Sequence, residues 1–408
     1  MLVRRQTRPP LTCAGSMTPF HERHRFARVV LCGGDGGIVG MTRRYLLDQP
    51  WFQEVTDLID QVRAEHDIGV QVVRLLTVAD EDQPVMRVDY LAQFEGETPN
   101  GLEPSPHALE PHPLRSDYAE IGGPRRLLDW AEGELDRIGH KVVRRTQQRT
   151  WNLSSIWRLD TGSATFWVKA VPTFFAHESR VLTLFADHGE PGMPRLVASR
   201  GGDMLLEHIP GEDAYGADRA QMEHMVRQLV DLQWRWAPRL DALRAAGVPD
   251  RGSDVLAATI PAVIRRHAHT MSGSRRAGLF QFVERLPERL ARLDDCDLPV
   301  SLVHGDYHPG NWRGTGLELV MLDWGDCVIG HPLLDFPGLL DRAGPHAAAV
   351  REAWLNAWRE KAPMPMSSRQ RNWRCASRTR GWRSSFRRSS TRLSRPSTST
   401  TRPTPGTS

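Results

Sequence analysis

The chain is short of lysine and cysteine, and it has no long apolar run. Only Lys141, Lys169 and Lys361 are lysines among the 53 basic residues, so arginine is used wherever a general positive charge is enough. The five cysteines are odd in number and show no C-x-x-C spacing, which argues against a disulfide framework and against a zinc site. No apolar segment approaches the roughly 20 residues of a membrane span. We therefore expect a protein of the reducing cytoplasm, without a membrane partner.

We expect no secretory signal at the N-terminus. Its first residues, MLVRRQTRPPLTCAGS, have a basic start but no apolar core segment. The sequence does not decide whether translation starts at Met1 or at Met17. At 408 residues the chain is long enough for two or three domains.

A double motif in the C-terminal third indicates chemistry. SLVHGDYHPGNW places Asp306 and Asn311 five positions apart, and VMLDWGD then places Asp323 before Trp324 and Gly325. Phosphoryl transfer from a nucleotide needs a carboxylate near the attacking hydroxyl and oxygen ligands for Mg²⁺. The same residue types also populate ordinary turns. Ordinary turns rarely reproduce both halves of the motif in this order, so we favour the chemical interpretation.

The pattern H-x-D-x-x-x-x-N followed by D-x-G resembles the catalytic and metal-binding loops of kinase-like folds. The segments HGDYHPGN, LDWGD and HPLLDF resemble motifs of the aminoglycoside phosphotransferase and choline kinase family. The resemblance covers about residues 124 to 362. The resemblance implies a bilobal, protein-kinase-like α+β fold. It implies Asp306 as the catalytic base or hydroxyl-orienting group, and Asn311 and Asp323 as Mg²⁺ ligands. By the same likeness, His304 braces the loop and Asp335 holds it from a following helix.

One lysine is a candidate for binding nucleotide phosphates. Lys169 ends the apolar, β-branched run TFWVKAV, which predicts a buried strand. Nine residues later, Glu178 lies in a segment whose apolar residues fall near helical spacing. Glu178 could pair with Lys169 and hold it toward the α and β phosphates, as the matching pair does in kinase folds. The alternative is that Glu178 is an exposed helix residue.

No glycine-rich loop precedes this strand. The corresponding stretch, QQRTWNLSSIWRL, offers Ser154 and Ser155, so hydroxyls and backbone amides would contact the phosphates. This departure from the protein kinases fits the small-molecule kinase family. Further on, MLLEHIPGE resembles the family's lobe-connecting hinge, in which Glu207 would offer its carbonyl and Ile209 its amide to the base of the nucleotide.

Residues 17–97 predict a small α/β domain, with strands at 26–34, 70–78 and 85–94 and a helix at 51–67. The passage from the helix to the next strand faintly resembles a nudix hydrolase. That family needs a glutamate-rich metal-binding box, and here Glu65 stands nearly alone. We therefore expect a structural or substrate-gating role for this domain.

The proline-rich residues 98–123 are typical of an extended linker. Residues 124–365 would form the kinase-like domain, with its N-lobe at about 124–209 and its C-lobe at about 210–365. The C-lobe is predicted to be mostly amphipathic helix, for example over 220–238 and 279–293.

The last segment, residues 366–408, has 11 arginines and no acidic residue. Without it the formal charge changes from +4 to −7, since 4 minus 11 is −7. It is either a disordered nucleic-acid-binding arm or an out-of-frame ending of a GC-rich gene. We favour the second and expect disorder in both cases. Aminoglycoside kinases use carboxylates near the C-terminus to bind a cationic acceptor, so this ending does not favour an aminoglycoside.

Taken together, the sequence predicts a phosphotransferase that moves the γ-phosphoryl group of ATP or GTP to a hydroxyl of a small molecule, with Mg²⁺. Its partners would be the nucleotide and the acceptor, and we do not expect nucleic acid. The alternatives are a catalytically silent kinase-fold binding protein with an incomplete acceptor site, and an arginine-tail nucleic-acid binder. The acceptor, the choice between ATP and GTP, and the oligomeric state are not set by the sequence.

Overall fold

The computed structural model describes residues 24–80 and 84–361. The arginine-rich segment 366–408 and both candidate start residues lie outside them. The described chain is α+β and divides into two compact units. One runs to Gly252 and resumes at Leu298, and the other comprises Ser253–Asp297. Within the described residues, no helix has the length and apolarity needed to cross a bilayer.

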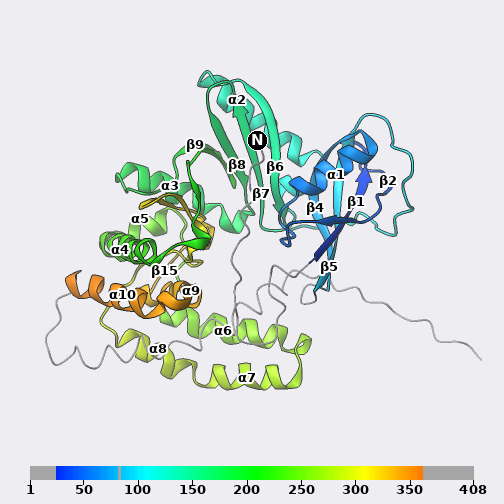
Figure 1. Cartoon of the computed structure of the whole chain (residues 1–408). Coiled ribbons are helices and arrows are strands. Elements are labelled where there is room, and N and C mark those ends of the chain that lie inside the picture. Colours follow the sequence, from blue (N-terminus) through cyan, green and yellow to red (C-terminus); the bar gives the residue numbers. More distant parts are fainter. Residues whose placement is uncertain (1–23, 81–83, 362–408) are drawn as a thin grey trace, which may run out of the picture. The chain divides into compact units, whose positions relative to one another are not determined.

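The first part of the larger unit is a five-stranded sheet in the order β2-β1-β5-β4, with β3 also pairing with β1 (Figure 1). β1 and β5 are parallel and the other pairs are antiparallel. One face packs against α1, where Leu58 and Val62 meet alternate strand residues such as Val29 and Val72. The elements are β1 (His24–Cys32), β2 (Ile38–Met41), β3 (Tyr45–Leu47), α1 (Thr56–His66), β4 (Gly69–Ala79) and β5 (Val85–Glu95).

The helix α1 begins at Thr56, five residues later than the sequence predicts. Residues 51–55 form a turn and a single β-bridge instead, and their backbone groups bond to another strand. The N–H of Thr150 donates to the carbonyl of Gln53 at 2.9 Å, and the N–H of Val55 donates to the carbonyl of Gln148 at 3.0 Å. A tertiary contact thus takes the backbone groups that a first helical turn would use.

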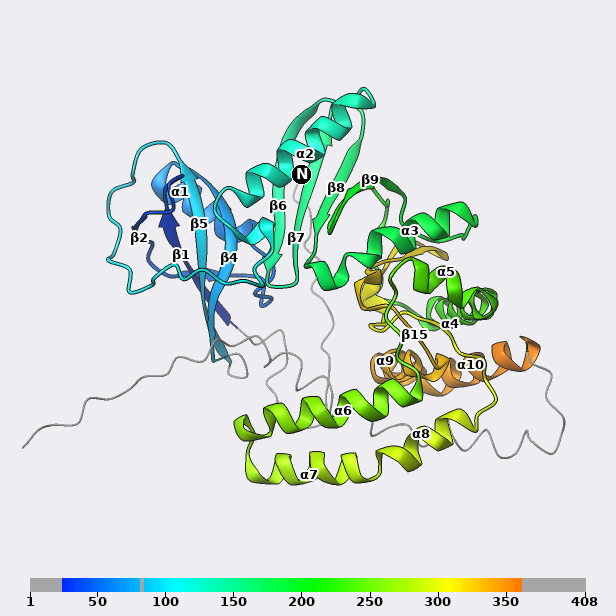
Figure 2. The same cartoon turned by 180° about the vertical axis from the view of Figure 1, so that it is seen from behind.

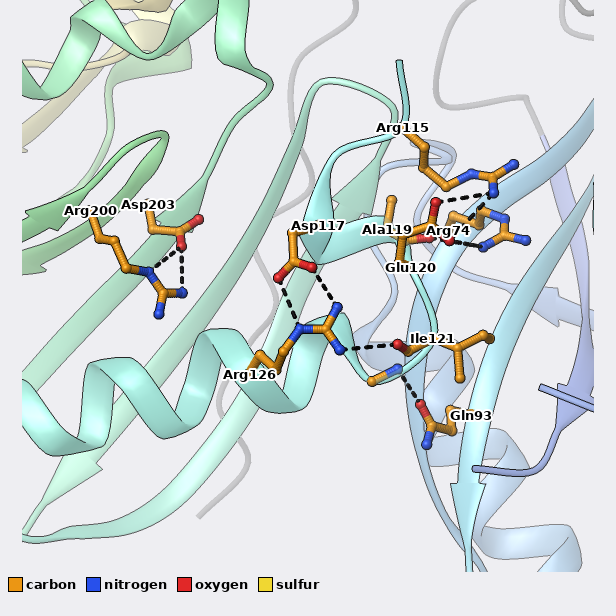
Figure 3. Close-up of polar contacts among 11 residues, drawn as sticks. Arg74, Gln93, Arg115, Asp117, Ala119, Glu120, Ile121, Arg126, Arg200 and Asp203 are labelled. Carbon is orange, nitrogen blue, oxygen red and sulfur yellow. Dashed lines mark hydrogen bonds and ion pairs between the residues drawn. The ribbon is translucent and has the colours of Figure 1, made fainter. Parts of the chain in front are cut away.

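The proline-rich segment at 98–123 is mostly irregular, with one 3₁₀ helix at Asp117–Ala119, and it packs on the second face of this sheet. Leu109 and Ile121 join a buried apolar cluster with Val30, Val73 and Leu91. Polar contacts fix the end of the segment, as Figure 3 shows. The pairs are Arg74 to the carbonyl of Ala119 at 2.9 Å, the N–H of Gly122 to Gln93 at 2.9 Å, and Arg115 to Glu120 at 3.2 Å.

The second sheet is antiparallel throughout and has the order β6-β7-β8-β10-β9. The helix α2 lies along one face of it and buries Leu127, Leu128 and Leu135 (Figure 2). The hairpin of β6 and β7 carries an irregularity between Gln147 and Arg149. The elements are α2 (Gly123–Arg137), β6 (Val142–Trp151), β7 (Ser154–Thr161), β8 (Thr165–Ala170), α3 (His177–Asp187), β9 (Leu196–Arg200) and β10 (Asp203–Glu207).

The rest of the larger unit is mainly helical, with two small sheets. A capping box of Asp218 and Gln221 starts α4 by satisfying backbone N–H groups of its first turn. β11, β13 and β14 form one small sheet, and β12 pairs with β15. The elements are β11 (Glu212–Asp213), α4 (Arg219–Trp236), α5 (Leu240–Ala245), β12 (Ser301–Val303), β13 (Trp312–Thr315), β14 (Glu318–Met321), β15 (Val328–Gly330), α9 (Phe336–Arg342) and α10 (Ala347–Lys361).

The smaller unit contains α6 (Ser253–His267), α7 (Gly273–Glu284) and α8 (Leu286–Asp294). They share a buried cluster that includes Ile260, Leu279 and Leu290. The residues predicted as helix over 279–293 are helical, but the helix is interrupted at Arg285, between α7 and α8. Pro287 explains the break, because it has no N–H to donate and is accommodated in the first turn of a new helix.

Candidate active site

The loop that follows β12 is held by a buried carboxylate. Asp335, directly before α9, accepts hydrogen bonds from the backbone N–H groups of His304 and Gly305, both at 2.8 Å. The side chain of Gln233 on α4 donates to the same carboxylate at 3.0 Å. Asp335 is fully buried, and a carboxylate that accepts several bonds holds its donors strongly. It fixes the backbone just before Asp306.

His304 joins this loop to the one that contains Asp323. Its Nδ1 accepts from the N–H of Asp306 at 3.3 Å, so its Nε2 carries the proton and donates to the carbonyl of Leu322 at 2.8 Å. Gly305 between them has φ of +85°, and a Cβ there would lie 2.0 Å from the carbonyl oxygen of Asp326. Only glycine fits this position.

Asp306 is oriented by two neighbours in its own loop. The amide nitrogen of Asn311 donates to the backbone oxygen of Asp306 at 2.8 Å and lies 3.4 Å from its carboxylate. Nε2 of His308 lies 3.3 Å from the same carboxylate oxygen. The Asp306 side chain is 30% exposed, so a held carboxylate faces solvent.

Lys169, Glu178 and Asp323 form an ionic triad. Nζ of Lys169, at the end of β8, lies 2.7 Å from Oε1 of Glu178 and 2.7 Å from Oδ1 of Asp323. The side chain of Glu178 is 3% exposed, whereas that of Asp323 is 54% exposed. Glu178 on α3 is thus a buried anchor that also accepts from the N–H of Trp324 at 3.1 Å. Asp323 presents an open carboxylate beside the lysine.

The triad sets its own protonation. Burial lowers the pKa of Lys169, but the charges of Asp323 and Glu178 outweigh this effect and raise it. The charge of Lys169 holds the pKa of Asp323 below its usual value. Burial raises the pKa of Glu178. Lys169 therefore remains an ammonium and Asp323 a carboxylate at neutral pH.

The backbone at Asp323 is also unusual. Its φ of 65° is left-handed, a conformation uncommon for residues other than glycine. Such conformations persist where the surroundings impose them, and they gather at functional sites. Three surrounding contacts impose it here: the His304 bond to Leu322, the Glu178 bond to Trp324 and the Lys169 ion pair.

The two candidate serines lie on opposite faces of the sheet. In the β7–β8 pairing Ile156 is opposite Lys169, so Ser154, two residues from Ile156, shares the face of Lys169. Ser155 points to the other face, where it is buried within 3.1 Å of the Thr150 hydroxyl and accepts from the Trp157 indole at 3.2 Å. The structure does not bring Ser155 to the candidate phosphate site.

The hinge residues lie at and after the end of β10. The N–H of Glu207 donates to the carbonyl of Arg195 at 3.0 Å. The carbonyl of Ile209 accepts from Arg313 at 2.8 Å. With that carbonyl engaged, the Ile209 amide is the group that this position would offer to a nucleotide base.

Sequence reasoning missed two residues of the site. His308 stands two positions after Asp306 inside the motif itself, so its place in the loop was a signal for its contact with the carboxylate. Gln233 lies on α4, 102 residues before Asp335 in sequence, and no local pattern indicates that contact.

The oxygen donors fit Mg²⁺, which binds one or two protein carboxylates and completes its shell with waters and substrate phosphates. Asn311 uses its amide nitrogen on Asp306, so its side-chain oxygen remains for a cation. Lys169 takes one oxygen of Asp323, and the other remains. Across the part of the chain that the structure describes, no group of three or more histidine, cysteine or acidic residues could hold a metal alone.

Several solved structures are similar to this chain at low identity. The macrolide 2'-phosphotransferase MphH from Brachybacterium faecium, an apoenzyme, is 16% identical, with 64% of this chain and 93% of that chain covered and a TM-score of 0.47. The choline kinase LicA from Streptococcus pneumoniae is 13% identical, with 64% and 97% covered and a TM-score of 0.41. No curated protein matches.

A family model gives the stronger result. The model described as the phosphotransferase enzyme family matches residues 148–369, which is 222 of the 408 residues (369 − 148 + 1). This span contains the triad, the loop of Asp306 and the brace at Asp335. The α+β, kinase-like fold class and the family resemblance predicted from the sequence are confirmed. The chain belongs to the phosphotransferase enzyme family.

Proposed function

We propose that this protein transfers the γ-phosphoryl group of ATP or GTP to a hydroxyl of a small molecule, with Mg²⁺. The observation that carries the proposal is the position of Lys169, 2.7 Å from both the buried Glu178 and the open Asp323. A lysine held in this way presents a fixed point charge to phosphates, and Asp323 lies beside it with a free oxygen. We also propose a cytoplasmic location, in keeping with Cys32 and Cys327, which are buried, unpaired thiols.

The residues around the nucleotide have distinct roles in this proposal. Lys169 binds the α and β phosphates, and Glu178 orients it. Ser154 and the backbone of the β6–β7 turn contact phosphate oxygens, while Glu207 and Ile209 bind the base through backbone groups. Ser155 is left out because its hydroxyl faces the interior.

Asp306 orients the acceptor hydroxyl and accepts its proton as the phosphoryl group leaves the nucleotide. Asn311 and His308 lie beside its carboxylate. Asn311 also donates to its backbone oxygen, and His304 accepts from its backbone N–H. Asp335 holds the two residues before it. Asn311 and Asp323 would hold Mg²⁺, which when bound neutralises phosphate charge. Catalysis would then rest on positioning and electrostatics, as phosphoryl transfer requires.

The test is direct transfer. The full chain would be incubated with Mg²⁺ and γ-labelled ATP or GTP against a set of hydroxyl-bearing acceptors, including aminoglycosides, macrolides and amino alcohols. We expect label on at least one acceptor, and loss of more than about 99% of that rate in Asp306→Asn. The variant should keep its affinity for nucleotide. Undiminished transfer by Asp306→Asn would remove Asp306 from the mechanism. Nucleotide binding without transfer to any acceptor would instead support a silent binding protein.

A further inference from the structure

The outer edge of the β6–β7 hairpin is covered by the N-terminal sheet. β6 is the edge strand of its own sheet, and an exposed edge leaves backbone groups unpaired. Residues 51–55, here named the docking segment, pair with this edge. The bonds of Gln53 with Thr150 and of Val55 with Gln148 flank a β-bridge between Glu54 and Arg149.

A buried glutamine extends this pairing to β4, which contacts β6 (Figure 1). The side chain of Gln147 accepts from the N–H of Val72 at 2.9 Å and donates to its carbonyl at 2.7 Å. Its amide nitrogen also lies 2.6 Å from the hydroxyl of Thr150, which in turn lies 3.1 Å from that of Ser155. The contact therefore reaches from the N-terminal sheet through β6 to the start of β7.

Side chains of the docking segment meet the last residues before the hairpin turn. Glu54 forms an ion pair with Arg149 at 2.8 Å. The ring of Phe52 meets the indole of Trp151 edge to face, with centroids 5.9 Å apart. The indole N–H of Trp151 donates to the hydroxyl of Ser154 at 3.0 Å, across the turn. Phe52 is thus two contacts away from the serine proposed to bind phosphate.

The docking segment is itself fixed from behind. Arg25 is fully buried, and its guanidinium donates to the carbonyls of Trp51 and Glu54, the latter at 2.6 Å. It also donates to the hydroxyl of Tyr90 at 3.3 Å, and that hydroxyl donates to the carbonyl of Phe52. Because the buried guanidinium of Arg25 donates to backbone carbonyls of the docking segment, it holds this segment rigidly in place.

We propose that the N-terminal sheet is a positioning part of the nucleotide site, which through Phe52 and Glu54 holds the β6–β7 turn in the conformation that binds phosphates. This inference rests on the proposed function. A free turn would lose conformational entropy when phosphates order it, and a turn already held by its neighbours loses less. The sequence lacks a glycine-rich loop at this position, and in this proposal the support from the N-terminal sheet compensates for its absence.

The experiment separates the phosphates from the base of the nucleotide. Calorimetry on the full chain would measure the affinity for ATP with Mg²⁺ and for adenosine, in the wild type, Phe52→Leu and Glu54→Gln. Adenosine meets the hinge but has no phosphate for the turn. Each variant should bind ATP about tenfold more weakly, which corresponds to about 1.4 kcal/mol, and bind adenosine as the wild type does. Glu65→Gln is the matched control, because Glu65 lies at the other end of α1 from the docking segment, and its ion pair with Arg43 at 2.9 Å does not involve β6.

Three outcomes would overturn the inference. If both variants bind ATP as tightly as Glu65→Gln does, the contacts do not position the turn. An equal loss for ATP and adenosine would show a general structural effect. A wild-type chain that binds no nucleotide would overturn the proposed function, and this inference with it.

Discussion

Replacing Asp335 by asparagine should loosen the loop of Asp306 at a predictable cost. The carboxylate accepts from His304 and Gly305 on different oxygens, and Gln233 shares the oxygen used by His304. An asparagine of the same shape can keep one oxygen, so its NH₂ group faces one backbone donor. The variant loses one bond to a charged acceptor and leaves a buried N–H unpaired. Together these changes should lower the free energy of unfolding by about 2–4 kcal/mol.

Denaturant unfolding of the full chain, followed by tryptophan fluorescence, would measure this change, since Trp312 and Trp324 are buried close to the loop. Asp341→Asn is the control, because Asp341 lies on the same helix α9 but is exposed. We expect the control to stay within about 0.5 kcal/mol of the wild type. If Asp335→Asn is as stable as this control, the carboxylate does not hold the loop.

Lys169→Met should weaken ATP binding at least about tenfold by calorimetry, and Lys169→Arg should not restore it, because a guanidinium fork does not replace a point charge against Glu178. Equal affinity in Lys169→Arg would contradict this role. In the N-terminal sheet, burial raises the pKa of Asp89, but Arg28 and Arg44 outweigh it and hold the pKa below its usual value. Its stabilisation is then present above about pH 4 and lost as the pH falls through the lowered pKa. Asp89→Asn should be less stable at pH 7 and lose less on acidification, and parallel stability–pH curves would contradict this.

Much of the site could be predicted because its signals are local. The motif fixes Asp306, Asn311 and Asp323 in one order, and a turn-rich loop of fixed length allows few arrangements. Lys169 stood out because the chain otherwise uses arginine and because its strand is apolar.

The contacts that could not be predicted are those between residues distant in sequence. Ser154 and Ser155 are adjacent residues of the same type, so the sequence alone does not distinguish them. Only the pairing of β7 with β8 decides which hydroxyl faces Lys169. Gln147 reads as a polar strand residue, yet it is buried because Val72 supplies both of its backbone partners.

Local patterns also misplaced two helix boundaries for physical reasons. The helical spacing of apolar residues continues upstream of Thr56, where α1 begins. The helix does not, because β6 binds the backbone groups of residues 53–55. Over 279–293 the apolar spacing continues across Pro287, whose missing N–H ends one helix and starts another.

The proposed nucleotide site is tested most directly by the Mg²⁺ dependence of ATP binding, measured by calorimetry on the full chain with the metal and with a chelator. We expect the wild type to bind ATP at least about tenfold more tightly with Mg²⁺. Asp323→Ala should lose this gain, and Asp306→Asn should keep it. An affinity that does not depend on Mg²⁺ in the wild type, or a full gain in Asp323→Ala, would contradict the assignment of Asp323 and the nucleotide site built around it.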